Sequence, residues 1–319
     1  AFQMLLLLLL LLCGGSIRST MQLDAASSTT CDNAAQHCTT SDSALSDSSN
    51  PKPQYLTRSY ASANELFQAY EQYHSSIVRD AAQLQRAHLA VFRVPGQGWA
   101  NRLRTFASTY LFAVLSGRVF LVDWSTPVPL SLLIQEAFPW DVSLAKLTHG
   151  QLNAGVTIVC KGPYEGRGGK VAHWLMFEQQ PLWQAMREQR ILAITGYSAF
   201  TTAFHANPYA RDVMRLFDTE CPLRNIFPYL VRPSARVAAA MQPYVERMRS
   251  HEVMALQMRL GSETNYFTPG PVKGYVSAGV MAKYESATAY ELWYDCAAKA
   301  LREDPSLLIF VATDNPVAV

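Results

Sequence analysis

Residues 88–123 read HLAVFRVPGQGWANRLRTFASTYLFAVLSGRVFLVD, and this stretch decides the fold class. The apolar run 88–94 is typical of a buried strand, and it stops at a reversal that contains proline and glycine. From Asn101 to Ser116 the large apolar residues recur on one helical face. Gly117 ends that helix, and the apolar run that follows predicts a second strand. A strand, helix, strand unit predicts a parallel sheet and therefore an α/β fold.

The same alternation continues on both sides of this unit. Residues 63–86 carry large apolar side chains at helical spacing. Downstream, short apolar runs at 156–160 and 191–195 predict strands, and the stretches 182–189 and 208–217 are expected to be helical. We place these elements in one Rossmann-like domain that spans residues 61–233.

A second set of elements follows Pro233. It consists of an expected helix over 235–249, a strand over 253–258, a helix over 287–301 and a strand over 307–312. We predict a second Rossmann-like, doubly wound domain over residues 234–319. Because the sequence stops soon after the last of these strands, we expect this domain to be incomplete.

The first 60 residues differ in composition from the rest. Residues 1–15 contain a run of leucines from Leu5 to Leu12, which indicates a targeting segment; both a signal peptide and the remnant of a signal anchor fit it. Residues 16–60 are rich in serine and threonine, so we expect a disordered stem. This layout is typical of a membrane-tethered enzyme of the Golgi or endoplasmic reticulum with a lumenal catalytic domain. A secreted protein is the alternative.

Charge and cysteine content argue against two kinds of ligand. With 27 basic and 25 acidic side chains, the net charge of +2 gives no overall field that would gather nucleic acid. The six cysteines lack the paired spacing of a structural zinc site. Cys31 and Cys38 close a short polar loop and can pair in an oxidising compartment, whereas free buried thiols explain the others at least as well.

Polar residues follow three of the expected strands, where α/β sheets bind their ligands. The first loop contains Gly98, Asn101 and Arg102. Glycine lets the backbone approach a ligand, and the arginine adds positive charge near a helix start, which favours anions. An ordinary turn in which Asn101 caps the helix explains the same residues.

The other two loops belong to the second domain. One contains Arg259, Gly261 and Glu263, and an arginine at the carboxyl end of a strand can hold a diphosphate and stabilise a leaving nucleotide. A surface ion pair between Arg259 and Glu263 is the alternative. The last loop begins at Thr313 and Asp314, whose hydroxyl and carboxylate can contact a nucleotide or a sugar, and a helix cap is the alternative.

Three segments, in this order, resemble motifs of the fucosyltransferase superfamily, which includes plant xyloglucan fucosyltransferases, α1,2- and α1,6-fucosyltransferases and protein O-fucosyltransferases. They are GWANRL with LSGRVFLVD downstream (98–103 and 115–123), LQMRLG (256–261) and VATD (311–314). The second is similar to the family's His-x-Arg-x-Gly motif and the third to its Ala-Thr-Asp strand end. The resemblance covers residues 88–319. It implies a GT-B fold, in which two Rossmann-like domains face a cleft: an acceptor domain over residues 61–233 and a nucleotide-sugar-binding domain over residues 234–319. It also implies GDP-fucose as the donor, inversion at the anomeric carbon and no metal requirement.

The resemblance also implies roles for single residues. Arg259 would bind the donor diphosphate, with Asn101 and Arg102 beside it in the cleft. Thr313 and Asp314 would line the donor pocket. The expected partners are therefore a nucleotide sugar and a glycan or glycoprotein acceptor, with no cofactor and with the N-terminal segment as the membrane tether.

Two departures from the family pattern leave alternatives open. Gln257 replaces the usual histidine, and two residues separate Gly98 from Asn101 where many members have none or one. A GT-B transferase with another nucleotide sugar fits these residues, as does a non-catalytic, secreted carbohydrate-binding protein of the same fold. Inverting transfer also needs a base for the acceptor hydroxyl; Glu263 is the candidate, and a solvated loop glutamate is the alternative.

The sequence argues against a metal-dependent GT-A transferase. Such an enzyme needs an Asp-x-Asp pair, and none occurs; the segment from Asp218 to Glu220 is only weakly similar.

Overall fold

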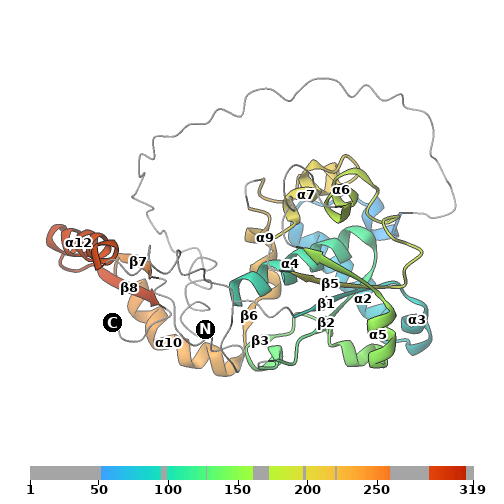
Figure 1. Ribbon diagram of the computed structural model, residues 1–319, viewed down its shortest axis with the longest axis horizontal. Coiled ribbons are helices and arrows are strands. Elements are labelled where there is room, and N and C mark those ends of the chain that lie inside the picture. The colour runs from blue at the N-terminus through green and yellow to red at the C-terminus, as the bar shows by residue number, and fades with distance from the viewer. Residues whose placement is uncertain are drawn as a thin grey trace, which may run out of the picture.

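The computed structural model describes residues 52–94, 99–126, 128–160, 172–196, 199–219, 221–258 and 287–313, and its main body is built on a parallel sheet (Figure 1). The strands of this sheet are β1 (Leu89–Arg93), β2 (Val119–Asp123), β4 (Val156–Cys160) and β5 (Ile191–Gly196), in the order β2-β1-β5-β4. Helix α4 (Trp99–Ser116) connects β1 to β2. The predicted strand, helix, strand unit and the α/β class are confirmed.

Strands β1 and β2 are buried on both faces, which is why their sequences are nearly continuous apolar runs. Side chains alternate between the faces with a period of two. Ala90 and Phe92 join the large cluster that contains the apolar residues of α4, whereas Leu89 and Val91 join a smaller cluster on the other face.

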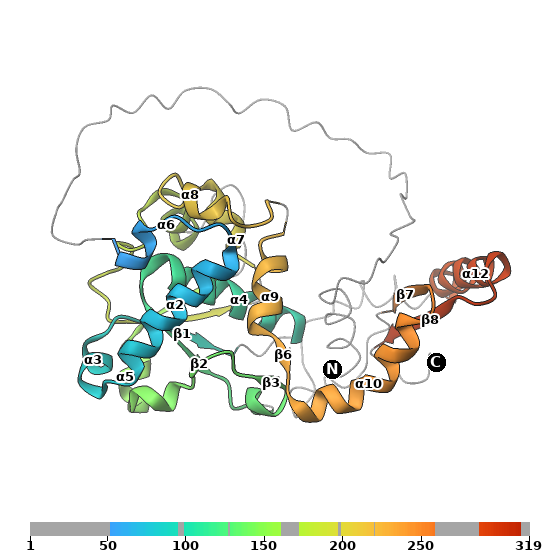
Figure 2. The ribbon, with the colours of Figure 1, turned by 180° about the vertical axis from the view of Figure 1, so that it is seen from behind.

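The remaining elements are mostly short. They are the helices α2 (Ala63–Val78), α3 (Ala81–Arg86), α5 (His149–Ala154), α6 (Ala172–Gln179), α7 (Thr201–Ala206), α8 (Arg211–Met214), α9 (Leu223–Leu230) and α10 (Ala235–Arg249), the 3-10 turns η1 (Gln54–Thr57), η2 (Leu130–Leu132) and η3 (Val142–Ala145), and the paired antiparallel segments β3 (Ile134–Gln135) and β6 (Arg232–Pro233). Figure 2 shows α2, α4 and α9 together on one side of the sheet.

Three helix predictions need correction. The expected helix over 208–217 is reduced to the single turn of α8, with non-helical turns on both sides of it. The expected helix over 63–86 is divided, because the Asp80 side chain accepts hydrogen bonds from the backbone of Ala82 and Gln83 and starts α3 as a separate helix. The expected helix over 182–189 is a series of turns in which Met186 has a φ of 49°. A left-handed residue cannot continue a right-handed helix.

The buried guanidinium of Arg118 fixes these turns. Its Nη2 donates to the Met186 carbonyl at 2.6 Å and to the Ala185 carbonyl at 3.3 Å, and its Nη1 donates to the Gln189 carbonyl at 2.9 Å. Carbonyls of residues 182–190 therefore accept hydrogen bonds from Arg118, instead of from the backbone amides of an α-helix.

Strands β7 (Val253–Met258) and β8 (Leu308–Thr313) form a second parallel pair, joined through α12 (Ala287–Glu303). In both ribbon views β7, β8 and α12 lie together, and α10 leads to them from the main body (Figures 1 and 2). The predicted parallel pair is confirmed. That these elements form a separate domain, beginning at residue 234 and facing a cleft, stays a prediction.

The end of the predicted stem belongs to the folded core. Tyr55 and Leu56 are buried, and the Tyr55 hydroxyl donates to the Val114 carbonyl. The stem prediction is therefore wrong for residues 52–60, while residues 1–51 lie outside the described residues. Of the helices in the described ranges, none is both long and apolar enough to cross a membrane.

Candidate functional site

The carboxyl ends of β1 and β2 are joined by an ion pair. Arg93 and Asp123 are partners in the parallel register, and the Arg93 Nε lies 3.2 Å from the Asp123 Oδ2. The backbone amide of Val94 donates to the Asp123 carbonyl at 3.2 Å. Both side chains are half-buried. The pair fixes the strand ends from which the predicted ligand loop departs.

The sequence alone does not mark Arg93 as a site residue. The available signal was a charged residue near the end of each of two apolar runs, at Arg93 and Asp123. Their pairing follows only from the strand register.

Helix α4 begins at this same edge and carries two of the predicted site residues in its first turn. Asn101 is half-buried and is the third residue of the helix, so the alternative that it caps the helix is wrong. Arg102 is 4% exposed. Gly98, which precedes the helix, lies outside the described residues.

The Arg102 side chain folds against the segment after β2. Its Nη1 donates to the Thr126 carbonyl at 3.4 Å, and its guanidinium carbon lies 5.8 Å from the ring centre of Trp124. Burial lowers the pKa of Arg102. Arg102 thus connects the helix start to the loop after β2 and places positive charge inside this edge.

The other predicted site residues follow the carboxyl ends of β7 and β8. Met258 and Thr313, the last residues of these strands, are partners in the register. Arg259 and Asp314 therefore each come one residue beyond the same sheet edge. Their side chains, and Gly261 and Glu263, lie outside the described residues, and for Thr313 only the backbone is described.

The predicted site residues thus fall into two groups on two separate sheets. Asn101 and Arg102 lie at the carboxyl edge of the β1–β2 pair, and the strands that precede Arg259 and Asp314 end side by side in the β7–β8 pair. Each group follows the rule that open α/β sheets bind ligands beyond the carboxyl ends of their strands. Their assignment to one donor site stays a prediction.

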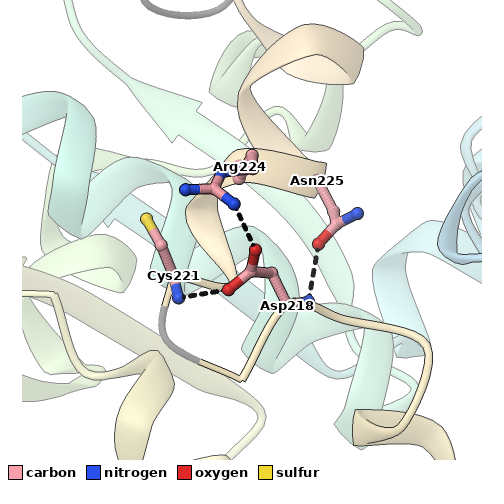
Figure 3. Close-up of polar contacts among 4 residues, drawn as sticks. All are labelled: Asp218, Cys221, Arg224 and Asn225. Atoms are coloured by element: carbon pink, nitrogen blue, oxygen red, sulfur yellow. Dashed lines mark hydrogen bonds and ion pairs between the residues drawn. The ribbon is translucent and has the colours of Figure 1, made fainter. Parts of the chain in front are cut away.

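The carboxylate of Asp218, the nearest substitute for a metal-binding Asp-x-Asp pair, is already engaged (Figure 3). It accepts from the Cys221 amide at 2.8 Å and from Nη1 of Arg224 at 2.6 Å. The Asp218 amide donates to the side chain of Asn225 at 2.9 Å. These contacts hold the turn before α9, so the described part of the segment has a structural role. Within the described ranges, no group of three or more His, Cys, Asp or Glu side chains could hold a metal ion.

Comparison with known proteins gives similarity at the level of structure. No protein-family model matches the sequence, and no curated protein sequence matches it. A solved structure of a mutant of Arabidopsis thaliana FUT1 in complex with GDP is similar with a TM-score of 0.48 and 16% identity, over 83% of this chain and 70% of that one. The structure of the fucosyltransferase NodZ from Bradyrhizobium is similar with a TM-score of 0.38 and 13% identity, over 72% of this chain and 73% of that one.

Proposed function

We propose that the protein is a glycosyltransferase that moves fucose from GDP-fucose to a glycan or glycoprotein acceptor, with inversion and without a metal ion. The observation that carries the proposal is the parallel register of β7 and β8, in which Met258 pairs with Thr313. This register supports the proposal because the described parts of two segments that resemble fucosyltransferase motifs end side by side, directly before Arg259 and Asp314 in the sequence. The fold proposed with it is GT-B.

The proposed chemistry assigns one task to Arg259. The acceptor hydroxyl oxygen attacks the anomeric carbon of fucose while the bond from that carbon to the diphosphate oxygen breaks. GDP leaves with the bonding electrons, so negative charge grows on its diphosphate. A guanidinium can hold this charge with paired hydrogen bonds and takes the place that a divalent cation has in metal-dependent transferases.

The acceptor proton needs a destination. Glu263 is the proposed base, since it is the carboxylate nearest in sequence to Arg259. Thr313 and Asp314 are proposed to contact the donor from the neighbouring strand. Asn101 and Arg102 are proposed to face the donor from the first sheet.

We also propose where the reaction occurs. The leucine run within residues 1–15 and the Ser/Thr-rich segment after it fit a tethered enzyme whose catalytic part lies in the lumen of the Golgi or endoplasmic reticulum. Localisation of a fluorescent fusion, compared with a variant whose leucine run is interrupted by charged residues, tests this. Retention in these compartments that is lost in the variant supports the tether, and cytosolic signal from the unaltered fusion refutes it.

Donor competition tests the reaction class. The protein is incubated with GDP-fucose, GDP-mannose or UDP-galactose in EDTA, and release of the free nucleotide is measured with and without an acceptor glycan mixture. We expect release from GDP-fucose that persists in EDTA and rises with the acceptor. Preference for UDP-galactose would indicate another transferase, and binding of glycans without any binding of GDP would indicate a non-catalytic protein.

A further inference from the structure

A groove of about 370 Å³ lies at the amino-terminal edge of the four-stranded sheet. Its wall includes His88, just before β1, and Gly117, between α4 and β2. Arg86 from the end of α3 and Arg187 from the turns at 182–190 complete two further sides. The volume falls within the range of small-ligand sites in proteins.

This groove is separate from the candidate donor site. The site residues Asn101 and Arg102 lie in the first turn of α4, whereas Ser116, its last residue, lines the groove. At a rise of about 1.5 Å per residue, the helix separates the two places by about 22 Å. A ligand held in the groove would therefore be distinct from the donor.

The groove has a basic lining. Arg86, Arg118, Arg187 and His88 contribute to it, and none of its described lining residues is Asp or Glu. Arg118 supplies charge alone, because its Nη atoms already donate to backbone carbonyls. Arg86 is exposed and Arg187 half-buried, so these two can offer N–H donors to a ligand.

His88 lies among these basic side chains in the lining of the groove. Burial lowers the pKa of the His88 imidazole, and the charges of Arg118, Arg187 and Arg190 lower it further. The carboxylate of Glu188 favours the charged form of Arg118, but it is exposed and is not part of the lining. The groove is thus a concave, positively charged surface, which attracts anions.

Neighbouring groups do not cancel this charge. The two carbonyls that follow α4 are occupied by tyrosine hydroxyls: Tyr73 donates to the Gly117 carbonyl at 2.7 Å and Tyr70 to the Arg118 carbonyl at 2.8 Å. Tyr73 and the half-buried Trp183 add aromatic surface to the lining. The groove therefore combines positive charge, which suits an anionic group of a ligand, with aromatic surface, which suits an apolar face of the same ligand.

We propose that this groove binds a uronic acid residue of an acidic glycan, with its carboxylate on Arg86 and Arg187 and its ring against Trp183. A planar carboxylate matches the donor geometry of guanidinium groups, and a sugar ring, which has polar hydroxyls and an apolar face, matches a lining that contains both arginines and aromatic rings. The site is independent of the proposed transferase activity, and it would let the protein hold a glycan away from the point of transfer.

Calorimetric titration of the full chain with trigalacturonic acid tests the proposal. The paired reagent is the same trisaccharide with its carboxyl groups methyl-esterified, and inorganic sulfate is the free-anion control. We expect binding of the acid, at least about tenfold weaker binding of the ester, and no displacement by sulfate at the concentration of the acid. Equal binding of acid and ester, or displacement by sulfate at that concentration, overturns the assignment.

Variants place the binding in the groove. Arg86→Gln with Arg187→Gln should weaken binding of the acid at least about tenfold. Arg236→Gln, an exposed arginine on α10 outside the groove, should bind as the native chain does. If the double variant keeps its melting temperature and also keeps native affinity, the site is elsewhere and the proposal fails. Titration in saturating GDP separates the two sites, because affinity for the acid should not change.

Discussion

Replacement of Arg118 by methionine probes how a motif residue holds the fold. The guanidinium is 3% exposed and has two short bonds, to the Met186 carbonyl at 2.6 Å and the Gln189 carbonyl at 2.9 Å. Its bonds to the carbonyls of Ala185 and Leu89, at 3.3 and 3.4 Å, are weaker. A fully buried carbonyl that loses its partner costs about 1–3 kcal/mol, so the two short bonds, which are part-buried, account for at most about 2–6 kcal/mol.

An opposing effect reduces this sum. Burial lowers the pKa of Arg118 to about 10, which means that the native fold bears a cost for keeping the charge away from water. Methionine removes that cost but cannot satisfy the carbonyls. We therefore expect Arg118→Met to lower the free energy of unfolding by about 2–4 kcal/mol. For a domain of this size, that corresponds to a fall in melting temperature of about 4–16 °C.

Urea unfolding and thermal melting, both followed by near-ultraviolet circular dichroism, measure this loss. Arg118→Lys is the matched variant, because one ammonium can satisfy some of the carbonyls but lacks the planar fork. The free energy of unfolding of Arg118→Lys should lie between those of the native chain and Arg118→Met. A stability of Arg118→Met within about 0.5 kcal/mol of native, the usual range of a surface change, would refute the idea that this arginine fixes the turns at 182–190.

Three further predictions concern single positions. Gly117→Ala should destabilise the fold by more than about 1 kcal/mol, measured by urea unfolding, because Gly117 has a φ of 70° and a new Cβ would meet the Pro53 ring at 2.4 Å; an unchanged midpoint would contradict this. Burial lowers the pKa of His74 to about 4, so between pH 6.5 and 4 the unfolded chain binds a proton that the folded chain does not. Stability should therefore fall by about 3 kcal/mol over that interval, and His74→Gln should flatten the profile; an equally steep profile in the variant would assign the loss to other groups. Asp218→Ala should cost about 1 kcal/mol in thermal unfolding and leave GDP binding unchanged, whereas loss of GDP binding would show that this carboxylate has more than a structural role.

The strands of the fold were predictable because their signal is local. The runs at 88–94, 118–123 and 253–258 are apolar on both faces, as buried parallel strands require, and each lies within a residue or two of the observed strand. The helix over 101–116 was also recognisable, since its apolar period and the glycine that ends it are close in sequence.

The errors arise where distant contacts override a local pattern. The turns at 182–190 depend on Arg118, more than 60 residues earlier in the chain. The burial of Tyr55, in the predicted stem, depends on the carbonyl of Val114. The division of the helix at Asp80 differs, because an aspartate that caps the backbone two and three residues ahead is a local signal that an apolar period alone does not reveal.

The candidate site was predictable only in part, for the same reason. That Arg259 and Asp314 follow strands can be read from the sequence, but that these strands are adjacent and in register is a property of the fold. The pairing of Arg93 with Asp123, and the packing of Arg102 against Trp124, likewise depend on how β1 and β2 align.

The most direct test of the central claim is the affinity of GDP for the native chain, Arg259→Lys and Arg259→Ala, measured by calorimetry in EDTA. We predict that GDP binds without a metal and that Arg259→Ala weakens its binding by about 10- to 150-fold. The affinity of Arg259→Lys for GDP should lie between those of the native chain and Arg259→Ala. Native affinity in Arg259→Ala, or binding that appears only when manganese is added, would contradict the central claim.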